Sequence, residues 1–108
     1  MKELYPIRVE RGISFLRREY PEQFKQAVDR IDELSMGFCH YCFLGLGFGH
    51  YFTAKRQFIK DGHCTQNNEE EFLIELGFTT PLRVSMETTH NDFTNLTETW
   101  KRLILKGG

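Results

Sequence analysis

The residues best suited to chemistry lie in the run Cys39-His-Tyr-Cys42. Two cysteines separated by two residues form one half of many zinc sites, because zinc prefers thiolate and imidazole ligands. His63 and Cys64 could complete a tetrahedral set. Adjacent residues converge poorly, however, and free cysteines are often buried for packing alone. A zinc-stabilised structural module with Cys39, Cys42, His63 and Cys64 as ligands is therefore one hypothesis; otherwise no cofactor is expected.

The same spacing occurs in redox-active Cys-x-x-Cys motifs, in which a helix N-terminus stabilises a thiolate. Cys39 is expected near the start of a helix and so meets that condition. Such motifs follow a strand in an alternating α/β fold, and no strand is expected before Cys39. Redox catalysis is therefore not expected.

Alternating glycines in Gly45-Leu-Gly-Phe-Gly49 invite comparison with phosphate-binding loops. The run lacks both the G-x-G-x-x-G spacing and the Gly-Lys-Ser/Thr of a P-loop. A nucleotide could still bind backbone N–H groups at the following helix N-terminus, beside the candidate binding residues His50, Tyr51, Lys55 and Arg56. The alternative is close approach of another backbone to small residues. No catalytic triad or carboxylate pair can be assigned from spacing, so we do not expect an enzyme.

The composition predicts one Phe-rich domain that spans residues 1–108. Ten of the 108 residues are Phe and 40% are apolar, which is not typical of a disordered chain. The net charge of -1 gives no overall field that would attract nucleic acid or a membrane, so neither is an expected partner. Three cysteines without an N-terminal signal sequence predict a cytoplasmic protein without disulfides.

Hydrophobic periodicity predicts an all-α or mostly α fold, a compact bundle of about five to six short helices. Apolar residues of the first helix recur at spacings of four, three and four, and the last helix has a similar stripe. The expected helices cover residues 8–19, a segment that begins at 21, residues 38–46 capped by Ser35, residues 50–60, a segment that begins at 69 and stops at Gly77, and a segment that follows a cap at Asn91. Residues 79–86 could form a short strand.

The stretch 34–52 holds the glycines, cysteines and aromatic residues discussed above and is too apolar to lie in water. It is also too short to span a bilayer, which takes about 20 uninterrupted apolar residues. We therefore expect it to form the buried centre of the domain, with a central apolar helix.

Four segments resemble small phage-encoded accessory proteins. They are Leu-Arg-Arg-Glu-Tyr-Pro-Glu-Gln-Phe (16–24), Cys-Phe-Leu-Gly-Leu-Gly-Phe-Gly-His-Tyr (42–51), Glu-Leu-Gly-Phe (75–78) and Leu-Thr-Glu-Thr-Trp-Lys (96–101). Members of that group often have Gln where this chain has Leu46, which argues against a polar role at that position. The resemblance implies a protein that acts by binding in the host cytoplasm.

Three functional hypotheses follow. The first, implied by the resemblance, is a non-enzymatic stoichiometric inhibitor that binds a host defence protein through exposed aromatic and charged residues. The second is a small-ligand or nucleotide-signal binding protein that uses the 45–56 region. The third is the zinc-stabilised module. The sequence leaves the partner and the oligomeric state open, a homo-oligomer included.

Overall fold

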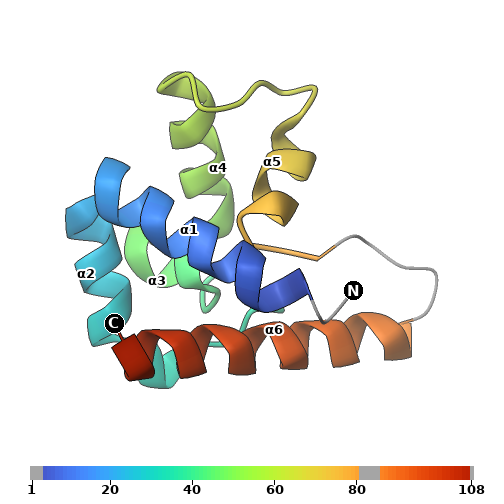
Figure 1. The fold of residues 1–108 in the computed structure, drawn as a ribbon. Helices are drawn as coiled ribbons and strands as arrows, with labels where there is room; N and C mark the ends of the chain where they lie inside the picture. The colour runs from blue at the N-terminus through green and yellow to red at the C-terminus, as the bar shows by residue number, and fades with distance from the viewer. Residues whose placement is uncertain (1–3, 81–85, 108) are drawn as a thin grey trace.

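The computed structural model describes residues 4–80 and 86–107, and these residues confirm the all-α prediction (Figure 1). Its elements are α1 (Tyr5–Glu19), α2 (Pro21–Asp29), the 3-10 turn η2 (Ile31–Glu33), α3 (Phe43–Phe48), α4 (Tyr51–Lys60), α5 (Glu69–Glu75) and α6 (Met86–Gly107). No strand occurs within the described ranges. The radius of gyration of 12.7 Å is that of a compact chain of this length.

Helix α1 lies at the centre of the arrangement and packs on α2, α5 and α6. It runs beside the long α6 in the same direction, while α4 and α5 stand on the other side of it (Figure 1). The predicted stripe of α1 is confirmed, because Val9, Ile13 and Leu16 are buried. The helix stops at Tyr20, whose backbone is pushed out of the helical region by Pro21.

The predicted apolar helix is present as the buried α3, but its predicted start was wrong. Helix α3 begins at Phe43, and residues 38–42 form a separate turn in which the N–H groups of Tyr41 and Cys42 donate to Phe38 O. A Cβ on Gly45 would lie 2.3 Å from Cys39 O. The chain therefore folds back onto its own helix at a glycine, which a continuous helix over 38–46 cannot do.

The glycines of this region are sites of close backbone approach, as one of the two sequence alternatives predicted. A Cβ on Gly47 would lie 2.6 Å from Gln23 O of α2. Gly49 has a φ of 96° and ends α3 with a reversal of the chain. Because α3 packs against α2, α4 and η2, these contacts fix the elements on both sides of the 38–42 turn.

The core is aromatic, as the composition predicted. Trp100 of α6 is fully buried and stacks on Phe43 at a centroid distance of 4.3 Å and on Phe78 at 5.7 Å. Its indole Nε1–H donates to Gly77 O at 2.6 Å. Gly77, with a φ of 75°, ends α5 as predicted, and Phe78 N–H then donates back to Leu73 O.

The last helix begins earlier than expected. The sequence predicts that this helix follows a cap at Asn91, but α6 already begins at Met86. Thr and Asn compete locally for backbone hydrogen bonds, yet propensity is a weak guide that a longer helix often overrides. Of the strand suggested for 79–86, residues 79 and 80 are not in a strand and residue 86 is helical; residues 81–85 lie outside the described part.

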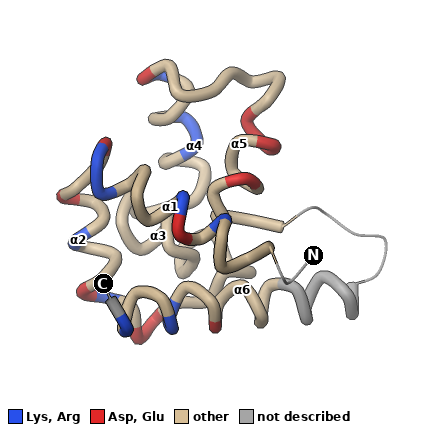
Figure 2. Tube along the Cα trace, viewed as in Figure 1, with Lys and Arg blue, Asp and Glu red and all other residues tan. Residues whose placement is uncertain are grey.

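Charged residues of both signs occur along α1, α2 and α6, whereas those of α4 are all basic and those of α5 all acidic (Figure 2). Acidic residues gather at the start of α5, where negative charge suits the positive end of a helix. None of the described helices is both long enough and apolar enough to cross a bilayer.

Candidate functional site

The 38–42 turn and the start of α4 are joined into one rigid unit. Tyr51 N–H donates to Cys39 O at 2.9 Å, and Cys42 N–H donates to Phe38 O at 2.8 Å. The reversal at Gly49 brings the two segments together. The side chains of these segments are thus positioned by backbone hydrogen bonds rather than by a free loop.

This unit exposes three large rings. Phe38 is 65% exposed, Tyr41 is 47% exposed and Phe52 is 45% exposed. We call these three residues, together with His40 and His50, the aromatic–histidine surface. The prediction that the whole 34–52 stretch is buried was therefore wrong for residues 37–41, Gly49 and Phe52, whereas residues 42–47 are buried as expected. Residues 37–41 remain at the surface because the packed helix α3 begins only after its cap residue, Cys42.

The two histidines link the turn to α4. Their rings lie 4.5 Å apart at 86°, and the His50 ring stacks on Phe52 at 5.4 Å and 23°. Phe52 N–H donates to His50 Nδ1 at 3.1 Å, which leaves the proton of neutral His50 on Nε2. His40 Nδ1 lies 3.2 Å from Gly49 O, and a carbonyl oxygen only accepts, so His40 Nδ1 donates. His40 Nε2 can then accept a hydrogen bond from a partner, and His50 Nε2 can donate one.

The structure gathers the four residues predicted for ligand binding around the start of α4, but it does not leave an open anion pocket. Lys55 Nζ lies 2.9 Å from Glu69 Oε1 of α5 and 4.9 Å above the Phe52 ring. His50 Nδ1 already accepts the hydrogen bond of Phe52 N–H in the first turn of the helix. Burial raises the pKa of the half-buried Tyr51 hydroxyl, which stays neutral. The charge of Lys55 and the backbone donors that a phosphate would use are thus already engaged.

Arg56 lies at the edge of the same region. Its Nε donates weakly to Phe52 O at 3.5 Å, and the residue is exposed. It therefore provides an exposed positive charge one helix turn after Phe52, and arginine is frequent at protein interfaces.

The predicted zinc set is not assembled. No three of Cys39, Cys42, His63 and Cys64, nor any other described group of three His, Cys, Asp or Glu residues, lies close enough together to hold a metal ion. The two pairs flank α4, whose ten residues span about 15 Å. His63 instead packs edge-on against Phe15 at 4.9 Å. The zinc hypothesis is therefore wrong for these four residues, because α4 holds the pair Cys39 and Cys42 away from the pair His63 and Cys64.

Cys42 has a structural role that the sequence did not reveal. It is the N-cap of α3, and its Sγ accepts from Gly45 N–H at 3.2 Å. Burial raises the pKa of this thiol to about 11, so it is protonated at neutral pH. Cys39, three residues earlier, is exposed.

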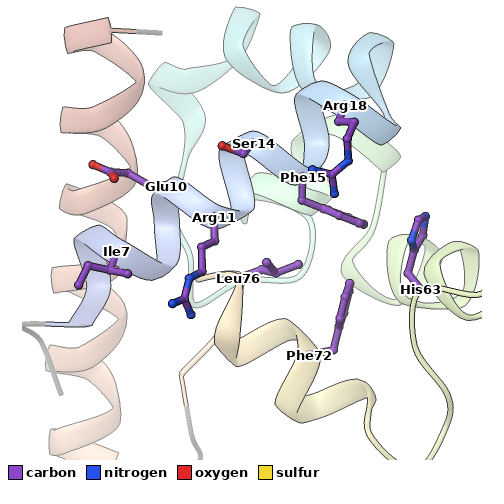
Figure 3. A pocket seen from close by; sticks show the side chains of 9 residues that line it. All are labelled: Ile7, Glu10, Arg11, Ser14, Phe15, Arg18, His63, Phe72 and Leu76. Carbon is purple, nitrogen blue, oxygen red and sulfur yellow. The ribbon is translucent and has the colours of Figure 1, made fainter.

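Apart from the aromatic–histidine surface, a hollow of about 650 Å³ lies where α1 meets α5 (Figure 3). Its lining residues are Ile7, Glu10, Arg11, Ser14, Phe15, Arg18, His63, Phe72 and Leu76. Its positive charges already face acids, since Arg11 lies 3.6 Å from Glu75 and Arg18 lies 2.9 Å from Glu19. This compensation leaves little net charge to select a ligand, so the aromatic–histidine surface is the stronger candidate site.

Sequence reasoning missed Phe38, His40 and Tyr41 as site residues. One sequence signal could have found them, because Gly37 lies directly before them and an isolated glycine at this place is typical of a turn. No protein-family model, curated protein sequence or solved structure matches the chain.

Proposed function

We propose that the protein acts by stoichiometric binding to another protein, through the aromatic–histidine surface. The observation that carries this proposal is the exposure of Phe38, Tyr41 and Phe52 on a backbone fixed by hydrogen bonds. Aromatic residues supply most of the binding energy at the centre of many interfaces, because they bury a large area at a low cost in side-chain entropy.

The surface is also pre-organised. His50 is held by its helix cap and by stacking on Phe52, and His40 is held by Gly49 O. A partner would therefore order few side chains on binding, which reduces the entropic cost of association. The histidines offer one donor and one acceptor that orient the partner, while Arg56 adds a positive edge.

The resemblance to phage accessory proteins suggests a bacterial host as the source of the partner, and a defence protein as its kind. An inhibitor of this type needs no catalytic group, only a surface that occupies its target at a fixed ratio. This setting rests on the sequence resemblance, whereas the binding surface rests on the exposed rings.

The test is affinity capture from bacterial lysate with three forms of the chain: the unaltered protein, the double variant Phe38→Ala/Tyr41→Ala, and the control Leu105→Ala. Leu105 is 72% exposed but lies near the end of α6, far from the 38–42 turn in sequence. We expect the unaltered protein and the control to capture the same species, and the double variant to lose it.

The complex is then reconstituted from purified components, and its ratio is measured by native mass spectrometry. Each ring at a hot spot contributes about 2 kcal/mol, so removal of one ring weakens the Kd roughly 30-fold. A double variant that binds as tightly as the unaltered protein would refute the assignment of the surface. Turnover of a substrate by the purified chain would refute the non-enzymatic function.

A further inference from the structure

We propose that Cys39 and Cys42 form a redox-reversible pair, which a small disulfide such as glutathione disulfide converts to an intramolecular disulfide. Both cysteines belong to one turn, in which Tyr41 N–H and Cys42 N–H donate to Phe38 O at 3.1 and 2.8 Å. The bond from Cys42 N–H to Phe38 O closes a single helical turn, in which residues three apart, such as Cys39 and Cys42, are neighbours on one face. Disulfides typically join Cα atoms about 4.4–6.8 Å apart, a separation that neighbours of this kind satisfy.

The Cys42 sulfur already faces residue 39. Its Sγ lies 3.7 Å from Cys39 O. Both cysteines also line the same hollow of about 100 Å³, beside Gly37, which has no side chain. A rotation of the Cys39 side chain into this hollow brings the two sulfurs together while the backbone of the turn stays in place.

The difference in exposure between the two cysteines sets the order of the steps. Cys39 is exposed, whereas Cys42 is buried and, with its pKa raised by burial, is mostly protonated at neutral pH. Because the thiolate is the nucleophile, the first attack comes from Cys39. Cys42 then acts as the resolving thiol inside the turn, where its partner is held at a high effective concentration.

Each step balances. Cys39 loses its proton and attacks one sulfur of glutathione disulfide, which forms a mixed disulfide and releases one glutathione thiolate. Cys42 then loses its proton and attacks the Cys39 sulfur, which closes the ring and releases the second glutathione. In total, two protein thiols give up two electrons and two protons, and one glutathione disulfide becomes two glutathione molecules.

Closure of this ring would encircle His40 and Tyr41, two members of the aromatic–histidine surface. Oxidation would therefore stiffen the surface and change how it meets a partner. This regulatory consequence rests on the proposed function, whereas formation of the disulfide does not.

The experiment uses the full chain, first reduced and then equilibrated with glutathione disulfide. Remaining thiols are alkylated in denaturant and mapped by mass spectrometry, with circular dichroism before quenching to confirm the helical fold. The reduced protein should take three labels, one for each cysteine. The oxidised protein should take one label, on Cys64, carry no glutathione, and regain three labels after dithiothreitol.

Variants make the assignment specific. Cys64→Ser should still lose both remaining labels on oxidation, whereas Cys39→Ser should form no intramolecular disulfide. Cys39 is exposed, so its replacement leaves the core intact. The proposal is overturned if the folded protein keeps three labels, if glutathione stays on Cys39 while Cys42 is alkylated, or if the disulfide includes Cys64. None of these measurements needs a partner, so failure here is distinct from failure of the binding proposal.

Discussion

Replacement of Gly12 by Ala tests the packing of the fold, because two physical effects predict opposite results. Gly12 lies inside α1, where Ala stabilises a helix by about 1 kcal/mol relative to Gly. A Cβ at this position, however, would lie 2.1 Å from Leu76 O at the end of α5. Helix propensity thus predicts stabilisation, and tertiary packing predicts destabilisation.

The carbonyl that opposes Gly12 cannot move easily. Phe78 N–H donates to Leu73 O at 2.9 Å, and Trp100 Nε1–H donates to the neighbouring Gly77 O at 2.6 Å. To relieve the clash, the contact must open from 2.1 Å to at least 3.0 Å. Overpacking of this kind costs about 1–3 kcal/mol, and a fixed backbone favours the upper end. With the gain of about 1 kcal/mol subtracted, the net loss is about 2 kcal/mol.

The assay is urea unfolding followed by fluorescence of the single tryptophan, which is fully buried and therefore reports on the core. A loss of about 2 kcal/mol lowers the urea midpoint by about 0.7–2 M, because the denaturant dependence of small proteins is about 1–3 kcal/mol per M urea. Ser14→Ala is the matched control: it lies on the same helix but is exposed, and should gain about 0.5 kcal/mol from propensity alone. A Gly12→Ala protein that is as stable as the parent, or more so, would refute the close contact between α1 and α5.

Three further predictions use the same unfolding assay, with circular dichroism where tryptophan is replaced. Trp100→Phe leaves Gly77 O without its donor and should cost about 1–3 kcal/mol; no loss would show that the hydrogen bond contributes nothing. Gly49→Ala meets no atom within 4 Å but adopts a φ of 96°, so it should lose about 1 kcal/mol through backbone strain alone, and an unchanged stability would contradict that backbone. The hydrogen bond from Tyr20 is the main cause that lowers the pKa of Asp61, so this carboxylate stabilises the fold above the ordinary carboxyl pKa and less as the pH falls through its folded value. Tyr20→Phe should therefore destabilise the protein more at pH 7 than at pH 3, and an equal loss at both would exclude this linkage.

Local chemistry made several parts of the fold predictable. The stripe of α1, the break before Pro21, the helix from the 50s to Lys60 and the stop at Gly77 each depend on neighbours within a few residues. Such signals act through short-range backbone preferences, and the helix boundaries that they predict are retained in the folded protein. The candidate ligand residues His50, Tyr51, Lys55 and Arg56 lie close to one another because they fall within the cap and the first two turns of α4.

The candidate site itself could not be predicted, because it depends on which aromatic residues find a packing partner. Phe38 and Phe43 are the same residue type five positions apart, yet one is 65% exposed and the other stacks on Trp100. The outcome depends on Trp100 of α6, which lies more than fifty residues after Phe43 in the sequence. Likewise the zinc hypothesis failed because the spacing along the chain did not show that α4 would hold the two halves apart.

By itself, the sequence determined that this chain forms helices around a Phe-rich core, since hydrophobic periodicity and the breaks at Pro and Gly act locally. Only the tertiary structure decided that the 38–42 turn leaves the core and presents its rings to solvent. The physical reason is that a glycine such as Gly45 permits another backbone to approach closely but does not specify which segment approaches. In this fold the approaching segment is the backbone of the 38–42 turn itself.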